Sequence, residues 1–129
     1  MAVTHTTTFR NATADSIGDN VNAGKLVFRI TGSTANAPAT AVATLTLNAD
    51  AFDAAGTGGA GKIQANAITS DVSAAGGTVA FATIETSGGV VKAHCAVAAS
   101  GSDIDFSNGL TVGAGDTVSC SALSYTAMP

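Results

Sequence analysis

Residues 77–98, GTVAFATIETSGGVVKAHCAVA, decide the fold of this chain. Two runs in which apolar or small residues recur at alternate positions flank the short connection at 86–89, TSGG. Successive side chains of a strand point to opposite faces of a sheet, so alternation on both sides of a Ser/Gly turn is typical of a β-hairpin. Both faces of the two runs carry apolar or small side chains. We therefore expect a central hairpin that is covered on both sides.

The composition favours a protein that is covered by neighbours in an assembly. Charged residues make up 11% of the 129 residues, and Trp is absent, whereas about 25% charged residues is usual. A monomer normally relies on a charged surface for its solubility. The net charge is −4, and Lys and Arg are scattered along the chain. This argues against nucleic acid as a partner, because phosphate binding requires clustered cations.

The chain carries no recognisable targeting segment. Its first residues, MAVTHTTTFRNATADS, lack the basic start and apolar core of a secretory signal. No run approaches the roughly 18 consecutive apolar residues of a membrane span. We therefore expect a protein made in the cytoplasm of the producing cell, without a membrane partner.

The two cysteines, Cys95 and Cys120, lie in strand-like runs with Val and Ala neighbours. For a protein made in the cytoplasm we expect two buried free thiols that behave as small apolar side chains. A disulfide across adjacent strands is the alternative.

A single helix is expected over residues 4–22. Thr6, Thr7 or Thr8 can cap its N-terminus, and Gly24 supplies its stop. The apolar stripe expected on this helix consists of Phe9, Ala12, Ile17 and Val21.

The rest of the chain is predicted to form short strands separated by turns. Inward positions are expected at Leu26, Phe28 and Ile30 in residues 25–31, and at Ala43, Leu45 and Leu47 in residues 41–47. Further strands are expected at 62–70, near 104–106 and 110–112, and over 117–126. Phe52 is expected to anchor in the core. Residues 32–40 and the exposed, mobile 53–61 are expected to be loops.

Roughly seven to nine short strands with regular turn signals predict an all-β fold. We expect a single β-sandwich or jelly-roll-like domain with one short N-terminal helix. Residues 1–24 would form the N-terminal arm and helix, and residues 25–129 the β-sandwich domain.

No recognisable catalytic or metal site is visible. His94 adjoins Cys95 on a strand, so their side chains face opposite sides, and His5 is far away in sequence. Residues 103–109, DIDFSNG, resemble a calcium loop, but the Gly falls one place late and Ala114 replaces the required acid. A strand followed by a turn explains the same residues. We expect no enzyme activity, no cofactor and no metal.

Several segments in order support a family resemblance. They are TTTFRNATADSIGDNVNAG leading into KLVFRITGS, then AVATLTLNADAF with its Gly-rich loop, KIQANAITSDVSAAGGTVAFATIETSGG, and DFSNGLTVGAGDTVSCSALSYT. The chain resembles small β-rich virion proteins of tailed bacteriophages. The resemblance implies a structural part of the particle, commonly a head decoration or cement protein. It implies the major capsid protein as partner, the capsid surface as location, and a homo-oligomer, with a trimer as our first expectation.

The N-terminal arm is the expected partner-binding segment. A polar terminal stretch with one aromatic and one cationic side chain can fold onto a partner. The expected binding residues are Thr6, Thr7, Thr8, Phe9 and Arg10. One alternative is a receptor- or glycan-binding β-module of a phage tail or fibre, although the lack of Trp and the single Tyr125 disfavour stacking on sugars. Another is a tail-tube or head–tail connector subunit, which would assemble as a ring.

Overall fold

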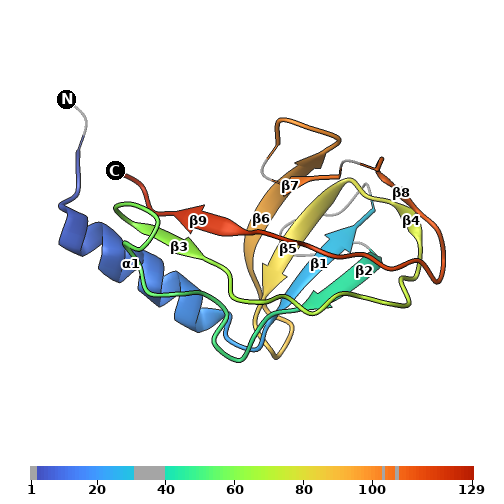
Figure 1. Ribbon diagram of the computed structural model, residues 1–129, viewed down its shortest axis with the longest axis horizontal. Helices are drawn as coiled ribbons and strands as arrows, with labels where there is room; N and C mark the ends of the chain where they lie inside the picture. The colour runs from blue at the N-terminus through green and yellow to red at the C-terminus, as the bar shows by residue number, and fades with distance from the viewer. Residues whose placement is uncertain (1–2, 31–39, 103, 107) are drawn as a thin grey trace.

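The computed structural model describes residues 3–30, 40–102, 104–106 and 108–129, so the loop expected at 32–40 lies outside the described residues except for Thr40. The chain is strand-rich, with one helix at its N-terminus (Figure 1). The elements are α1 (Thr7–Asn20), β1 (Lys25–Arg29), β2 (Ala41–Thr46), β3 (Lys62–Gln64), β4 (Gly77–Thr78), β5 (Phe81–Glu85), β6 (Val91–Ala98), β7 (Ile104–Asp105), β8 (Thr111–Val112) and β9 (Ser124–Thr126).

The strands form a curled five-stranded mixed sheet and two two-stranded pairs. The order in the large sheet is β2-β1-β5-β6-β7. Its neighbours pair antiparallel except β6 and β7, which run parallel with Val97 opposite Ile104. The small pairs join β3 to β9 and β4 to β8. The predicted strand pieces near 104–106 and 110–112 therefore exist as β7 and β8.

The predicted hairpin is confirmed, since β5 and β6 pair antiparallel with Thr83 opposite His94. Its first run is not one strand, because residues 77–78 belong to β4 and pair with β8. The expected cover on both sides holds for β5, where Ala82 and Thr83 are fully buried. It is wrong for β6, which exposes Lys92, His94 and Ala96 on one face. The reason is position, since β5 is flanked by two long strands and β6 by only one.

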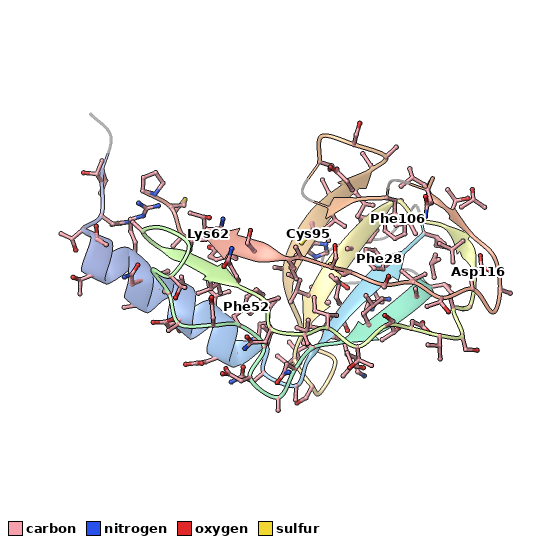
Figure 2. The ribbon with its side chains drawn as sticks, viewed as in Figure 1. Phe28, Phe52, Lys62, Cys95, Phe106 and Asp116 are labelled. Carbon is pink, nitrogen blue, oxygen red and sulfur yellow. The ribbon has the colours of Figure 1, made fainter. Side chains whose placement is uncertain are left out.

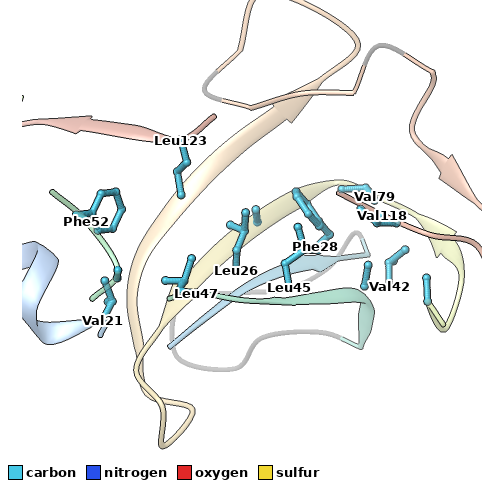
Figure 3. Packing of buried hydrophobic residues seen from close by; sticks show 14 of the residues in the cluster. Val21, Leu26, Phe28, Val42, Leu45, Leu47, Phe52, Val79, Val118 and Leu123 are labelled. Atoms are coloured by element: carbon cyan, nitrogen blue, oxygen red, sulfur yellow. The ribbon is translucent and has the colours of Figure 1, made fainter. Parts of the chain in front are cut away.

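The core lies on one face of the large sheet, as predicted for β1 and β2. Leu26, Phe28 and Leu45 are at most 1% exposed. Figure 3 shows these side chains on the same side of the sheet as Val118 and Leu123 of the C-terminal segment. Phe52 is also buried in this cluster, which confirms it as an anchor.

The predicted helix is confirmed over a shorter range. Thr6 is its N-cap, and its Oγ1 accepts a hydrogen bond from the Phe9 backbone N–H at 3.3 Å. The expected apolar stripe is wrong at Phe9 and Ala12, which are exposed, and right at Val21, which is 1% exposed. Ala14 and Gly18 are the buried residues within the helix. A Cβ at Gly18 would lie 3.3 Å from side-chain atoms of both Ile63 and Phe52. The helix therefore turns its smallest residue to the core so that its backbone can approach closely.

The helix ends differently from the expected glycine stop. Val21 is the C-cap, and the left-handed backbone conformation falls on Ala23, with φ +54°. Gly24 is instead required by a close approach, because a Cβ there would collide with the carbonyl oxygen of Glu85. This contact is between the chain entering β1 and the end of β5.

The Gly-rich loop at 53–61 is largely exposed, as expected, and hydrogen bonds attach it to α1. The side chain of Asn11 accepts from the Gly61 backbone N–H at 2.7 Å, and that of Asp15 accepts from Ala55 at 2.7 Å. The next predicted strand, at 62–70, is confirmed only at its start, as β3, and is followed by isolated bridges at Ala65 and Thr69.

The long strand predicted at 117–126 is wrong. Val118 forms one isolated bridge with Asp71, and regular pairing returns only in β9 at residues 124–126. Residues 119–123 belong to no strand. The segment alternates like a strand, but within the described chain no backbone pairs with residues 119–121.

Candidate binding surfaces

The residues expected to bind a partner lie at the start of α1. Thr6 caps the helix, and Thr7 and Thr8 are exposed in its first turn. Phe9 is 56% exposed, and its ring centroid lies 4.9 Å from that of His5. These residues are therefore the beginning of a helix rather than an extended arm.

Arg10 differs from its neighbours because it is half-buried and holds the C-terminus. Its Nη2 donates a hydrogen bond to the Ala127 carbonyl oxygen at 3.1 Å. Its Nε is buried and makes no hydrogen bond within the described residues. Arg10 thus fixes the end of the chain against the start of the helix, which places both termini at one end of the molecule (Figure 1).

This end carries three exposed apolar side chains, which we call the terminal patch: Val3, Phe9 and Met128. They are 82%, 56% and 73% exposed. Phe9 is adjacent to Arg10 and Met128 to Ala127, so the Arg10–Ala127 hydrogen bond brings the two chain ends together. Large apolar side chains exposed at one end of a molecule are candidates for contact with another macromolecule.

A second feature is a groove of about 690 Å³ in the C-terminal half. Its walls come from residues 104–106, 108–109, 111–112 and 116–122, and Phe28 of β1 contributes to its floor. Phe28 and Phe106 meet edge to face, with ring centroids 4.8 Å apart (Figure 2). A smaller hollow of about 300 Å³ lies beside it, and residues 120–122 line both.

Two carboxylates lie on the groove, and each has one local hydrogen bond. Asp105 accepts from the Ser102 backbone N–H at 2.9 Å, and Asp116 from Gly113 at 2.8 Å. Among the described residues that line the groove there is no Lys, Arg or His. The groove is therefore acidic, and each carboxylate retains an oxygen that can accept from a ligand.

The backbone of residues 119–121 has no partner within the described chain. No hydrogen bond there involves the backbone N–H or C=O of Ser119, Cys120 or Ser121. The segment is nevertheless held on both sides. Val118 exchanges two backbone hydrogen bonds with Asp71, at 2.8 and 3.0 Å, and the carbonyl of Leu123 accepts from Ala65 at 2.8 Å.

Neither cysteine forms a disulfide in the structure, as expected, but both are half-buried rather than buried. The Cys120 thiol donates to the Ala122 carbonyl oxygen at 3.3 Å. Burial raises the pKa of this thiol, so Cys120 remains protonated at neutral pH and is a poor nucleophile.

The charged cluster of the large sheet is a structural one. Arg29 Nη2 lies 2.7 Å from Glu85 Oε2, and the side chains of the two residues are only 13% and 6% exposed. The Thr83 hydroxyl accepts from Arg29 Nε at 3.1 Å and donates to Glu85 Oε2 at 2.6 Å. These three side chains therefore supply hydrogen-bond partners to one another between β1 and β5.

The two histidines lie on different parts of the molecule. His94 is on the exposed face of β6, with its ring centroid 5.8 Å from that of Phe81, and His5 lies before α1. Across the described residues, no three His, Cys, Asp or Glu side chains group as a metal site would require. Of the calcium-like segment, Asp103 and Ser107 lie outside the described residues, and Asp105 belongs to β7.

Sequence reasoning missed the groove. Its wall at 117–122 has the same alternating pattern as a paired strand, so its unpaired backbone could not be recognised. The only available signal was composition, since Ser119, Cys120 and Ser121 are small residues with little apolar surface to bury. Met128 and Val3 were missed because a pattern gives no information on which chain ends meet.

The described part of the chain has no helix with the length and apolar character needed to cross a membrane. Comparison of the chain with protein-family models, with curated proteins and with solved structures found no match in any of the three.

Proposed function

We propose that this chain is a non-enzymatic structural protein of a phage particle that decorates the capsid and contacts the major capsid protein through the terminal patch. The observation that carries the proposal is the exposure of Val3, Phe9 and Met128 at one end of the molecule. Burying such side chains in a contact is favourable, because it removes apolar surface from water.

Two properties of the sequence support this proposal. The first is the resemblance to small β-rich virion proteins. The second is the low charge, 11% of residues, which suits a surface that neighbouring subunits cover. The terminal patch also includes Phe9, one of the residues expected to bind a partner.

The proposal includes the finer architecture and the assembly. In it, residues 25–129 form a β-sandwich or jelly-roll-like domain, and residues 1–24 form the arm and helix that reach the partner. The protein is made in the host cytoplasm and then binds the capsid surface of the virion. The resemblance to head decoration proteins implies a homo-oligomer, and on that ground we propose a homotrimer as the bound form.

The test is co-sedimentation of the purified protein with empty capsids assembled from the major capsid protein of the same genome. We expect saturation at about one copy per capsid subunit, because a homotrimer bound symmetrically to three capsid subunits places one copy on each. Phe9→Ser should weaken binding by about tenfold or more, because it removes an aromatic contact. Val72→Ser is the matched control, since Val72 is 72% exposed outside the terminal patch, and it should bind as the unsubstituted protein does.

Substitution of Phe9 alone tests the terminal patch more specifically than a deletion of residues 1–10 would. The deletion would remove the Thr6 cap and the Arg10–Ala127 hydrogen bond together with Phe9. Absence of binding, or only a few copies per particle, would contradict decoration. Equal weakening by Phe9→Ser and Val72→Ser would contradict the role of the terminal patch.

A receptor-binding module of a phage tail or fibre is the second candidate. The observation that favours it is the groove of about 690 Å³, which lies within the size range of ligand-binding pockets. Binding of few copies per particle, together with attachment of the protein to host cells, would favour this candidate over decoration.

A further inference from the structure

The groove has a property that the terminal patch lacks, namely a row of unpaired backbone groups along one wall. Neither the N–H nor the C=O of residues 119–121 has a partner within the described chain. Residues 119–121 belong to no strand and the chain bends at Ser121, but exposed backbone groups without a partner are available for hydrogen bonds to another chain. The flanking bonds at Val118 and Leu123 hold the segment in place, so little ordering would be required when a partner binds.

There is also space beside this backbone. The larger hollow extends from residues 116–122 to Phe28, Phe106 and Val112, and the smaller one lies next to residues 120–122. Neighbouring strands lie about 4.8 Å apart, so an added strand needs an open margin of this kind. Phe28, Phe106 and Val112 contribute apolar side chains to the lining, but most of its exposed surface is polar, which suits a segment that binds through hydrogen bonds.

The charges of the groove specify the partner further. Asp105 and Asp116 lie on its walls, and no cationic side chain is among the described lining residues. A bound segment with a Lys or Arg would find a complementary charge, whereas an acidic segment would be repelled.

The aromatic residues argue for a peptide rather than a sugar. A sugar would need an exposed aromatic face on which to stack, but Phe28 is 1% exposed and meets Phe106 edge to face. A peptide uses the unpaired backbone groups directly, as in strand addition to a sheet margin.

We propose that the groove binds an extended segment of a partner protein, which pairs with the backbone of residues 119–121 and directs a basic side chain toward Asp105 and Asp116. This contact is separate from the terminal patch and does not depend on decoration.

The test uses the full-length protein and a displayed library of linear peptides of about ten residues, the upper length of a typical strand. The tightest peptide is synthesised, and its affinity is measured by fluorescence anisotropy. Amide hydrogen exchange is followed by NMR with and without the peptide. We expect selected peptides to be enriched in Lys or Arg, and bound peptide to slow exchange at residues 119–121.

A pair of substitutions at one position separates backbone from side-chain recognition. Ser121→Pro removes an N–H that has no partner in the free protein, and it should weaken peptide binding by about tenfold. Ser121→Ala keeps the N–H and removes only the hydroxyl, so it should bind as the unsubstituted protein does. Phe9→Ser should also leave peptide binding unchanged, which distinguishes this groove from the terminal patch.

Several results would overturn the proposal. They are the absence of selected peptides, exchange protection confined to other residues, equal weakening by both Ser121 substitutions, and displacement of the peptide by soluble saccharides. If Ser121→Pro fails to fold, the exchange pattern of the unsubstituted protein decides the question alone.

Discussion

The outer edge of β2 and the backbone of residues 119–121, which belong to no strand, both carry backbone groups that a neighbouring segment could pair with, but only the first is covered within the described chain. Thr46 exchanges two backbone hydrogen bonds with Thr69, at 3.1 and 2.9 Å, and the Val42 carbonyl accepts from Gly76 at 3.2 Å. Between them, the Thr44 N–H donates to the carboxylate of Asp71 at 2.8 Å. Residues 69–76 thus cover the β2 edge without forming a strand, whereas nothing in the described chain covers 119–121.

The comparison shows two backbone segments of one chain, of which one is covered by another segment and the other is not. An exposed strand edge invites pairing with other chains, so folded proteins cover such edges or use them for binding. The β2 edge is blocked partly by a carboxylate that substitutes for a backbone acceptor. We therefore regard residues 119–121 as the margin available to a partner.

The largest effect on stability is expected at Phe28, which is buried in the core of the large sheet and also lines the groove. Phe28→Ala should lower the free energy of unfolding by about 3–5 kcal/mol, because it leaves a cavity where a fully buried ring packs against Phe106. Urea unfolding followed by circular dichroism measures this. Phe9→Ala is the control, since the exposed Phe9 should change stability by less than about 0.5 kcal/mol. A similar small loss for Phe28→Ala would contradict the observed packing.

An intermediate effect on stability is expected at Gly24, where the chain entering β1 approaches the end of β5 closely. Gly24→Ala places a methyl group against the Glu85 carbonyl oxygen, and it should cost about 2–3 kcal/mol because backbone must move to accept it. The measurement is the thermal midpoint together with the unfolding free energy. Gly88→Ala is the control, because the nearest atom to its Cβ would be Thr86 Oγ1 at 3.8 Å. Equal stability of the two variants would contradict the close approach at Gly24.

The smallest effect concerns the carboxylate that covers the β2 edge. Hydrogen bonds from the Thr44 backbone N–H and then from that of Ser73 lower the pKa of Asp71. A carboxyl whose pKa is lowered by folding stabilises the fold above its unfolded pKa, near about 3.9, and loses this contribution as the pH falls through the folded value. Asp71→Asn keeps an amide oxygen as acceptor, and solvent screens the partly exposed carboxylate, so the substitution should cost less than about 1 kcal/mol at neutral pH.

The stability difference between Asp71→Asn and the unsubstituted protein should narrow as the pH falls below about 4. Unfolding in urea at a series of pH values measures this. A difference that stays constant across the series would contradict the role of the charged Asp71.

Local sequence patterns were sufficient to predict the helix and the longer strands. Alternation located β1, β2, β5 and β6, and the run of threonines located the helix start, because these features depend on neighbours in sequence. The same reasoning was wrong for the buried face of α1. Gly18 faces the core because Phe52 and Ile63 approach it there, and this contact joins segments far apart in the chain.

By itself, the sequence determined a strand-rich chain with one N-terminal helix, the hairpin of β5 and β6, and the inward residues of β1 and β2. Only the tertiary structure decided which margins are covered. Residues 81–85 and 119–121 have similar alternation, yet β5 lies between two strands and 119–121 lies beside a groove. The physical reason is that a strand requires hydrogen bonds from a second segment, and the position of that segment depends on the packing of the whole chain.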